Sequence, residues 1–123
     1  MFKKSGNTLH ITRGDGGMLT LQYPDHTFST AEDVVINIYR ENTMDAEPVM
    51  YWTTEENITG HSCDASFDGD TVEITIPGEY TQLDNPITEV VPYWWEAVCG
   101  EKTFICYDEQ GPKILNLYPG GIN

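Results

Sequence analysis

The sequence predicts an all-β fold, built as an antiparallel β-sandwich of about 7–9 short strands. Apolar residues alternate with polar ones in nearly every segment, which is typical of strands that bury one face. Gly, Pro, Asn and Asp residues separate these segments at intervals of about 8–12 residues. No segment carries helical periodicity beyond about one turn. A small closed barrel fits the same pattern, because alternation does not report whether a sheet closes, but we favour the sandwich.

The length and composition suit one domain spanning residues 1–123. Hydrophobic residues make up 39% of the chain, which is enough for a core and excludes wholesale disorder. No apolar run approaches the roughly 20 residues of a membrane span. Lys3 and Lys4 near the start have no apolar stretch behind them, so we expect no signal peptide.

The first half of the chain begins with residues 1–7, which we expect to be a loose leader. Strands are then predicted at Thr8–Thr12 and Met18–Gln22, joined by a glycine-rich turn. Val34–Arg40 is the strongest strand signal because it is rich in β-branched residues. Pro48–Thr53 is predicted as an edge strand, since proline can only begin one.

The second half continues the pattern with two hairpins and a last strand. Ser62–Phe67 and Thr71–Ile76 flank the turn signal Asp68-Gly69-Asp70, and Cys63, Ala65 and Phe67 should face inward. One helical turn is predicted within Pro77–Asp84. The remaining predicted strands are Tyr93–Cys99, Lys102–Tyr107 and, within a C-terminal tail at 108–123, Ile114–Tyr118. We expect Ile36, Ile38, Ile74 and Trp95 to be core residues.

The hairpin at Gly100-Glu101 is apolar on both faces. A two-residue turn there places Trp95 opposite Cys106 and Ala97 opposite Phe104. A sandwich strand needs only one inner face, so the second face requires a cover. The C-terminal tail and another subunit are both suitable covers, and the sequence leaves the choice open. The candidate interface residues on this face are Trp94, Val98, Ile105 and Tyr107.

The charge of the chain restricts its partners. Acidic residues outnumber basic ones by 20 to 6, for a net charge of −14. A field of that sign repels nucleic-acid phosphates and anionic lipid, so we expect neither nucleic-acid nor membrane binding. The charge itself favours solubility and attraction to basic partners or cations.

Few residue patterns point to chemistry. The three histidines share no metal-ligand spacing, so we predict no metal site built on them. Without a phosphate-binding glycine loop or a nucleophile motif, we also predict no cofactor and no catalytic residues. The sequence leaves open whether a cation binds the acidic surface. Asp64-x-Ser66-x-Asp68 matches half of a calcium loop but lacks the acid at the twelfth position. The tripeptide Arg13-Gly14-Asp15 is also an integrin-binding motif, although a turn between strands explains it better.

The cysteines are odd in number and form no CxxC pair, which favours a reducing compartment. In the hairpin register above, Cys99 and Cys106 share a face but stand roughly 13 Å apart at the strand rise. A disulfide needs Cα atoms closer than about 7 Å. We therefore predict three thiols and no disulfide.

Several stretches together resemble a known family. Ile11-Thr12-Arg13-Gly14-Asp15, followed by Leu19 and Leu21, resembles the opening of small immunoglobulin-like proteins of tailed bacteriophages and prophages. The N-terminal domain of the phage baseplate upper protein is the best-known relative. The acidic pair before VVINIYR, the run VEITIPGEYT and the closing run YWWEAV also follow that pattern in the same order.

This resemblance implies an immunoglobulin-like sandwich with a structural, non-enzymatic role in a phage tail or baseplate. Its partners would be other virion proteins or further copies of itself, and it would assemble in the bacterial cytoplasm before entering the virion. The alternative is a ligand-binding sandwich, such as a carbohydrate-binding or host-surface adhesion domain. For that alternative the candidate stacking residues are Tyr51, Trp52 and Trp94.

Overall fold

The computed structural model describes residues 1–6, 8–29, 32–43, 45–83, 87–106 and 112–120. Within these ranges the regular elements are ten strands and one short 3-10 helix. The elements are β1 (Phe2–Ser5), β2 (Thr8–Thr12), β3 (Gly17–Gln22), β4 (Val34–Tyr39), β5 (Met50–Thr53), β6 (Asp64–Asp68), β7 (Thr71–Ile76), η1 (Gly78–Thr81), β8 (Val91–Cys99), β9 (Lys102–Ile105) and β10 (Ile114–Tyr118).

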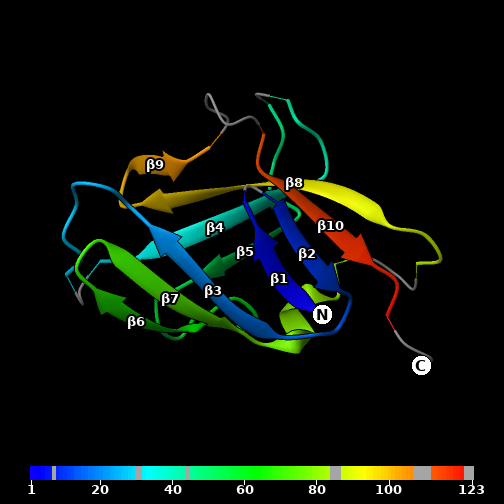
Figure 1. Ribbon diagram of the computed structural model, residues 1–123, viewed down its shortest axis with the longest axis horizontal. Coiled ribbons are helices and arrows are strands. Elements are labelled where there is room, and N and C mark those ends of the chain that lie inside the picture. Colours follow the sequence, from blue (N-terminus) through cyan, green and yellow to red (C-terminus); the bar gives the residue numbers. More distant parts are fainter. Residues whose placement is uncertain (7, 30–31, 44, 84–86, 107–111, 121–123) are drawn as a thin grey trace.

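The strands form two sheets that pack as a sandwich, which confirms the predicted fold class. The larger sheet has seven strands in the order β1-β2-β10-β8-β4-β5, with β9 also paired to β8. The smaller sheet has the order β3-β7-β6. Figure 1 shows the smaller sheet as a layer in front of β4, β5 and β8.

The core lies between the two sheets and is built from the alternate residues of each strand. Ile36 and Ile38 of the large sheet are 0% exposed, Ile74 of the small sheet is 1% exposed and Trp95 is 3% exposed, as predicted. The core residues of the large sheet are Leu9, Ile11, Val34, Ile36, Ile38, Trp52, Tyr93, Trp95, Ala97, Cys99, Leu115 and Leu117. Those of the small sheet are Leu19, Leu21, Val72, Ile74 and Ile76.

The two core tryptophans differ in how their indole groups are satisfied. The indole N–H of Trp52 donates to the backbone oxygen of Tyr80 at 3.1 Å. The indole N–H of Trp95 is buried and has no hydrogen-bond partner among the described residues. Leaving a buried N–H without a hydrogen-bond partner lowers the stability of the fold by roughly 1–3 kcal/mol.

Phe2–Ser5 form a strand, so the prediction of a loose leader is wrong for these residues. β1 pairs antiparallel with β2 from Phe2 opposite Ile11 to Ser5 opposite Thr8. Gly6 adopts a positive φ of 60° in the turn between them, and the Phe2 ring lies 6.5 Å from that of Trp52. A single apolar residue therefore anchors an otherwise polar strand, and period-two analysis misses such a strand.

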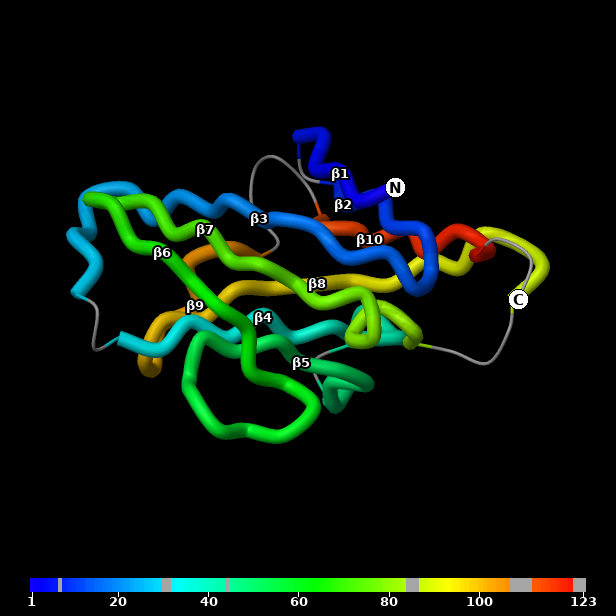
Figure 2. The backbone as a smooth tube through the Cα atoms, turned by 90° about the horizontal axis from the view of Figure 1, so that it is seen from below, coloured from blue at the N-terminus to red at the C-terminus, as the bar shows by residue number. Residues whose placement is uncertain are grey.

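The pairing is not antiparallel throughout. β10 lies between β2 and β8, parallel to β2 and antiparallel to β8. Figures 1 and 2 both show β2 and β10 side by side. The last strand thus joins the first and last parts of the chain within one sheet.

Strand β6 is an exposed edge, which corrects one predicted core residue. Cys63, just before it, is buried, and Phe67 is half-buried, but Ala65 is exposed. β6 pairs with β7 on one side only. A methyl side chain on an edge strand does not reach across to the opposite sheet.

The Arg13-Gly14-Asp15 segment forms the turn that carries the chain from the large sheet to the small one. The Thr81 hydroxyl of η1 is fully buried, and it accepts a hydrogen bond from the Gly14 N–H at 2.9 Å. A Cβ atom on Gly78 would lie 2.3 Å from the Gly14 oxygen, so only glycine fits there. Close backbone packing therefore explains this glycine-rich region without a binding role.

Candidate functional site

A groove lies on the outer face of the large sheet, the face that points away from the core. Its volume is about 330 Å³. Tyr39, Trp94 and Glu96 line it from β4 and β8, while residues 41–43 with Ala46 and the pair Pro112-Lys113 line it from flanking segments. We call this feature the outer groove.

Three side chains at and beside the outer groove form a row across β4, β8 and β10. Tyr39 is the partner of Trp94 in the β4–β8 register, and Trp94 is the partner of Ile114 in the β8–β10 register. All three residues are half-buried. Two aromatic side chains and an aliphatic one thus make a continuous apolar strip on a face that the core does not need.

A hydrogen-bonded carboxylate lies beside this strip. Glu96 accepts hydrogen bonds through one oxygen from the Tyr39 hydroxyl at 2.7 Å and from the Asn37 amide at 3.1 Å. Burial and the neighbouring Glu96 carboxylate raise the pKa of Tyr39 to about 12. The phenol therefore stays neutral and holds the carboxylate in place next to the Trp94 ring.

Of the predicted interface residues, Trp94 and Val98 lie on the outer face. Ile105 does not: the bulge places it opposite the core residue Ala97, and it packs against the core. Trp94, Val98 and Ile105 are half-buried, and Val98 pairs with Val35 of β4. Tyr107 lies outside the described residues.

Within the described part of the C-terminal tail, strand β10 does not cover this face, contrary to one of the two predicted covers. β10 extends the sheet edge to edge, and its Leu115 and Leu117 are 0% exposed in the core. Ile114 and Tyr118 stay half-buried. A paired strand places alternate side chains on both faces, so it cannot lie flat over a neighbouring strand.

The closing hairpin also differs from the predicted register. Cys99 is opposite Lys102 as expected, but a bulge follows, and Ala97 is opposite Ile105 rather than Phe104. Cys106 lies beyond the end of β9 and is exposed instead of facing the core opposite Trp95. An extra residue in one strand shifts every later pair, and period-two alternation does not reveal it.

The three predicted stacking residues do not form one surface. Trp52 is 0% exposed, so it cannot serve as a platform for a ligand. Tyr51 is half-buried and stacks on His61, with ring centroids 3.8 Å apart. Trp94 alone of the three lines the outer groove.

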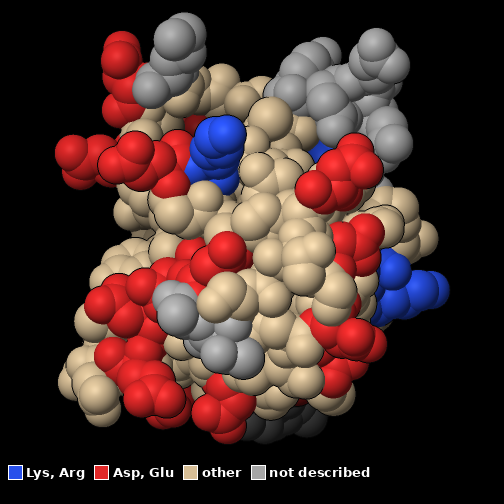
Figure 3. All heavy atoms as spheres, turned by 90° about the vertical axis from the view of Figure 1, so that its left-hand side faces the viewer, with Lys and Arg blue, Asp and Glu red and all other residues tan. Residues whose placement is uncertain are grey.

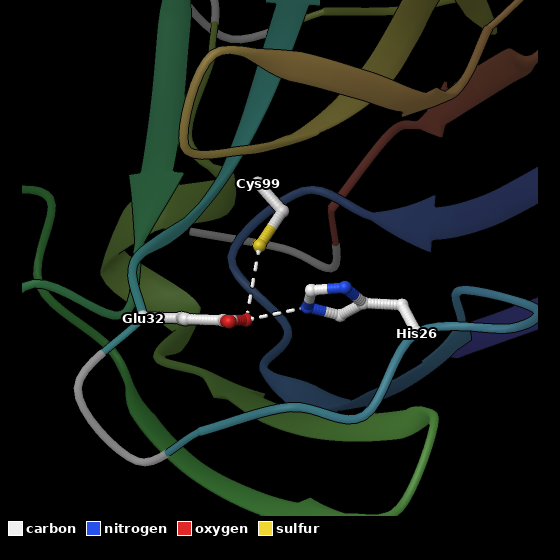
Figure 4. A group of neighbouring side chains, drawn as sticks. All are labelled: His26, Glu32 and Cys99. Carbon is white, nitrogen blue, oxygen red and sulfur yellow. Dashed lines mark hydrogen bonds and ion pairs between the residues drawn. The ribbon is translucent and has the colours of Figure 1, made fainter.

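A second cluster, which the sequence analysis missed, lies at one end of the sandwich. His26 and Glu32 come from the segment between β3 and β4, and Cys99 is the last residue of β8. His26 Nε2 is 2.7 Å from Glu32 Oε2, and the Cys99 thiol donates to that same oxygen at 3.4 Å. Figure 4 shows the three side chains pointing toward one another. We call them the His–Glu–Cys cluster.

Local backbone structure positions His26 in this cluster. Pro24 and Asp25 form a turn in which Asp25 has a φ of 65° and the His26 N–H donates to the Tyr23 oxygen at 3.2 Å. That arrangement matches a type II turn, with proline second and a positive φ third. The His26 ring then stacks on Tyr23, with centroids 4.5 Å apart.

The pKa values of Glu32 and Cys99 shift in opposite directions. The hydrogen bond from His26 lowers the pKa of Glu32. Burial, together with the hydrogen bond to Glu32, raises the pKa of the Cys99 thiol to about 11. At neutral pH Glu32 is therefore ionised, and Cys99 keeps its proton.

Spacing in sequence could not reveal this cluster, because its ligand atoms come from positions 26, 32 and 99. The sequence does contain the turn signal Pro24-Asp25, which positions His26. The pairing of Val34 on β4 with Cys99 on β8 is visible only in the structure. That pairing brings the residues before Val34 beside Cys99.

Comparison with known proteins adds no relative. No protein-family model and no curated protein matches the sequence. Across the residues that the structure describes, no helix is long and apolar enough to cross a membrane.

Proposed function

We propose that this protein is a non-enzymatic structural component of a phage or prophage particle, of the tail or baseplate type. It would act through protein–protein assembly at the outer face of the large sheet. The observation that carries the proposal is the apolar row of Tyr39, Trp94 and Ile114 on the outer face, of which Tyr39 and Trp94 line the outer groove. Aromatic residues are enriched in interface cores because they bury a large area at small entropic cost.

The resemblance of the strand motifs to small immunoglobulin-like phage proteins supports the virion setting, and the sandwich fold agrees with it. The partner is a further copy of the chain or a neighbouring virion protein. Net charge separates these partners, because two chains of charge −14 repel each other. Added salt should therefore strengthen self-association and weaken binding to a basic partner.

The test is sedimentation velocity of the wild type and of Trp94→Asp over a range of protein and salt concentrations. We expect concentration-dependent oligomers for the wild type and a folded monomer for Trp94→Asp. Met18→Asp is the matched control, because Met18 is 58% exposed on the outer face of the small sheet. A wild type that stays monomeric in every condition would contradict self-assembly, and a coding sequence without tail or capsid genes beside it would contradict the virion role.

One observation favours a second candidate, a carbohydrate-binding module. The outer groove combines the Trp94 ring with the Glu96 carboxylate and Asn42, and an aromatic platform with polar groups beside it suits a sugar ring. A glycan array should then show binding that Trp94→Ala abolishes and that Tyr51→Ala retains. No response on the array would leave assembly as the role of the groove.

A further inference from the structure

The His–Glu–Cys cluster brings three different metal-ligand atoms together. One nitrogen, one oxygen and one sulfur atom from His26, Glu32 and Cys99 all lie within 4.8 Å of one another. The atoms come from two parts of the fold: His26 and Glu32 from the segment between β3 and β4, and Cys99 from the end of β8. Tertiary structure, and not a local charge run, therefore creates the cluster.

The ligand set matches one class of metal ion. Zinc-class divalent ions bind imidazole nitrogen, carboxylate oxygen and thiolate sulfur in tetrahedral sites. At metal–ligand distances of about 2.0–2.3 Å, tetrahedral ligand atoms lie roughly 3.3–3.7 Å apart. The observed separations include 2.7 Å for His26–Glu32 and 3.4 Å for Cys99–Glu32. Side-chain rotations that move these atoms by about 1 Å would bring all three into that range.

The surroundings of the cluster give an ion access from solvent. They also leave room for a fourth ligand. His26, Glu32 and Cys99 line a pocket of about 600 Å³, together with Tyr23, Asp33 and the Gly100–Lys102 turn. The side chains of His26 and Glu32 are each 30% exposed, so they have room to turn. Figure 3 views the molecule from this end and shows many acidic side chains and few basic ones. That field attracts a cation.

We infer that His26, Glu32 and Cys99 form a binding site for a zinc-class divalent metal ion, with a fourth position open to water or to a ligand. Binding replaces the hydrogen bonds of the cluster: Nε2 of His26, Oε2 of Glu32 and Sγ of Cys99 each donate an electron pair to the ion. The thiol proton of Cys99 passes to solvent, and the proton on Nε2 of His26 also leaves, so that the ligating neutral imidazole carries its proton on Nδ1. No change of oxidation state is involved.

A bound metal ion would link two segments of the fold. The ion would tie the β3–β4 segment to the end of β8, which are otherwise joined here by the Gly100 N–H donating to the Asp33 oxygen at 3.4 Å. This inference is independent of the proposed function, because the site lies away from the residues that line the outer groove.

The experiment is a titration of the full chain with Co²⁺, a spectroscopic substitute for Zn²⁺, followed by competition with Zn²⁺. We expect a sulfur-to-cobalt charge-transfer band that saturates at a single ion per chain and disappears as Zn²⁺ displaces Co²⁺. Cys99→Ser should abolish the band. His26→Gln should also weaken binding. Losing a residue that only hydrogen-bonds to a metal ligand lowers metal affinity roughly 10–100-fold, and we expect at least that loss for the ligand itself.

Controls separate this site from adventitious binding. Cys63→Ser removes the other buried thiol and should leave the titration unchanged. Excess Mg²⁺ occupies exposed carboxylates but not a thiolate site, so it should not compete. A wild type without a charge-transfer band, or a band that persists in Cys99→Ser, would overturn the inference.

Melting temperatures with and without Zn²⁺ provide a second measurement of metal binding, which is needed if a variant folds poorly. Zn²⁺ should raise the melting temperature of the wild type and of Cys63→Ser, because an ion that binds the folded state stabilises it. Glu32→Gln retains the shape of the side chain and should lose most of this rise. An equal rise in Glu32→Gln and in the wild type would contradict the role of Glu32.

Discussion

Along β3 of the small sheet, Leu19 and Leu21 are buried, whereas Met18, Thr20 and Gln22 are exposed. Along β8 of the large sheet, the residues between the buried ones are instead half-buried from Trp94 to Val98. Both strands thus bury their inner sides, but the outer side of β3 is exposed, whereas that of β8 is half-buried from Trp94 to Val98.

The difference has two physical causes. Strands β2, β10, β8 and β4 each have a neighbour on both sides, so their outer side chains shield one another. The outer residues of β8 are also larger and more apolar than those of β3. An apolar, mutually shielded face favours contact with another molecule at little further entropic cost, which is why we place assembly on the large sheet.

The largest expected effect concerns the inner faces, where the sheets should behave alike. Ile36→Ala and Ile74→Ala should each lower the free energy of unfolding by roughly 2–5 kcal/mol, through lost burial and a residual cavity. Urea denaturation measures both. Thr75→Ala, at an exposed position next to Ile74, should stay within about 0.5 kcal/mol of the wild type. A loss below about 1 kcal/mol at either isoleucine would mean that its sheet does not share the core.

The outer faces should differ under the same polar substitution. Val98→Asn on the large sheet should cost about 1–2 kcal/mol, because it removes a half-buried apolar side chain beside Val35. Thr20 on the small sheet is exposed, so Thr20→Asn should change stability by less than about 0.5 kcal/mol. Equal costs in urea denaturation would remove the distinction between the two faces.

The cysteines extend the comparison to chemical access. Burial raises the pKa of the Cys63 and Cys99 thiols to about 11, whereas Cys106 is exposed. Near neutral pH an aromatic disulfide reagent should therefore modify Cys106 rapidly and the other two slowly, since the thiolate is the nucleophile. In denaturant without reductant all three should react. A denatured count of one would indicate a disulfide and contradict the structure.

The smallest effect concerns Tyr39 on the outer face of the large sheet. Removing its hydrogen bond to Glu96 in Tyr39→Phe should cost roughly 0.5–1.5 kcal/mol near neutral pH. The pKa of this phenol is raised from 10 to about 12 in the folded state. Its contribution is therefore complete below pH 10 and is lost as the pH rises toward 12.

Denaturation series at rising pH measure this difference. The stability gap between the wild type and Tyr39→Phe should narrow across that alkaline range. A gap that stays constant would mean that the phenol titrates equally in the folded and unfolded states.

Much of the fold could be predicted because the evidence for it is local. Alternation identified β2, β4, β7 and β10 to within about a residue at each end, and it identified the buried faces of β2, β4 and β7. The failures occurred where a strand lacks that pattern. β1 has Phe2 as its only apolar anchor, and the bulge between β8 and β9 shifts the pairing without changing the alternation.

The sequence by itself determined the all-β class, the inner faces and the apolar character of the outer face at Trp94. Those properties follow from the chemistry of successive side chains. Only the tertiary structure decided that β10 lies parallel to β2, that Trp52 is enclosed in the core, and that His26 and Glu32 meet Cys99. These outcomes depend on which strand edges pair and on where distant segments end, and no stretch of neighbouring residues encodes either one.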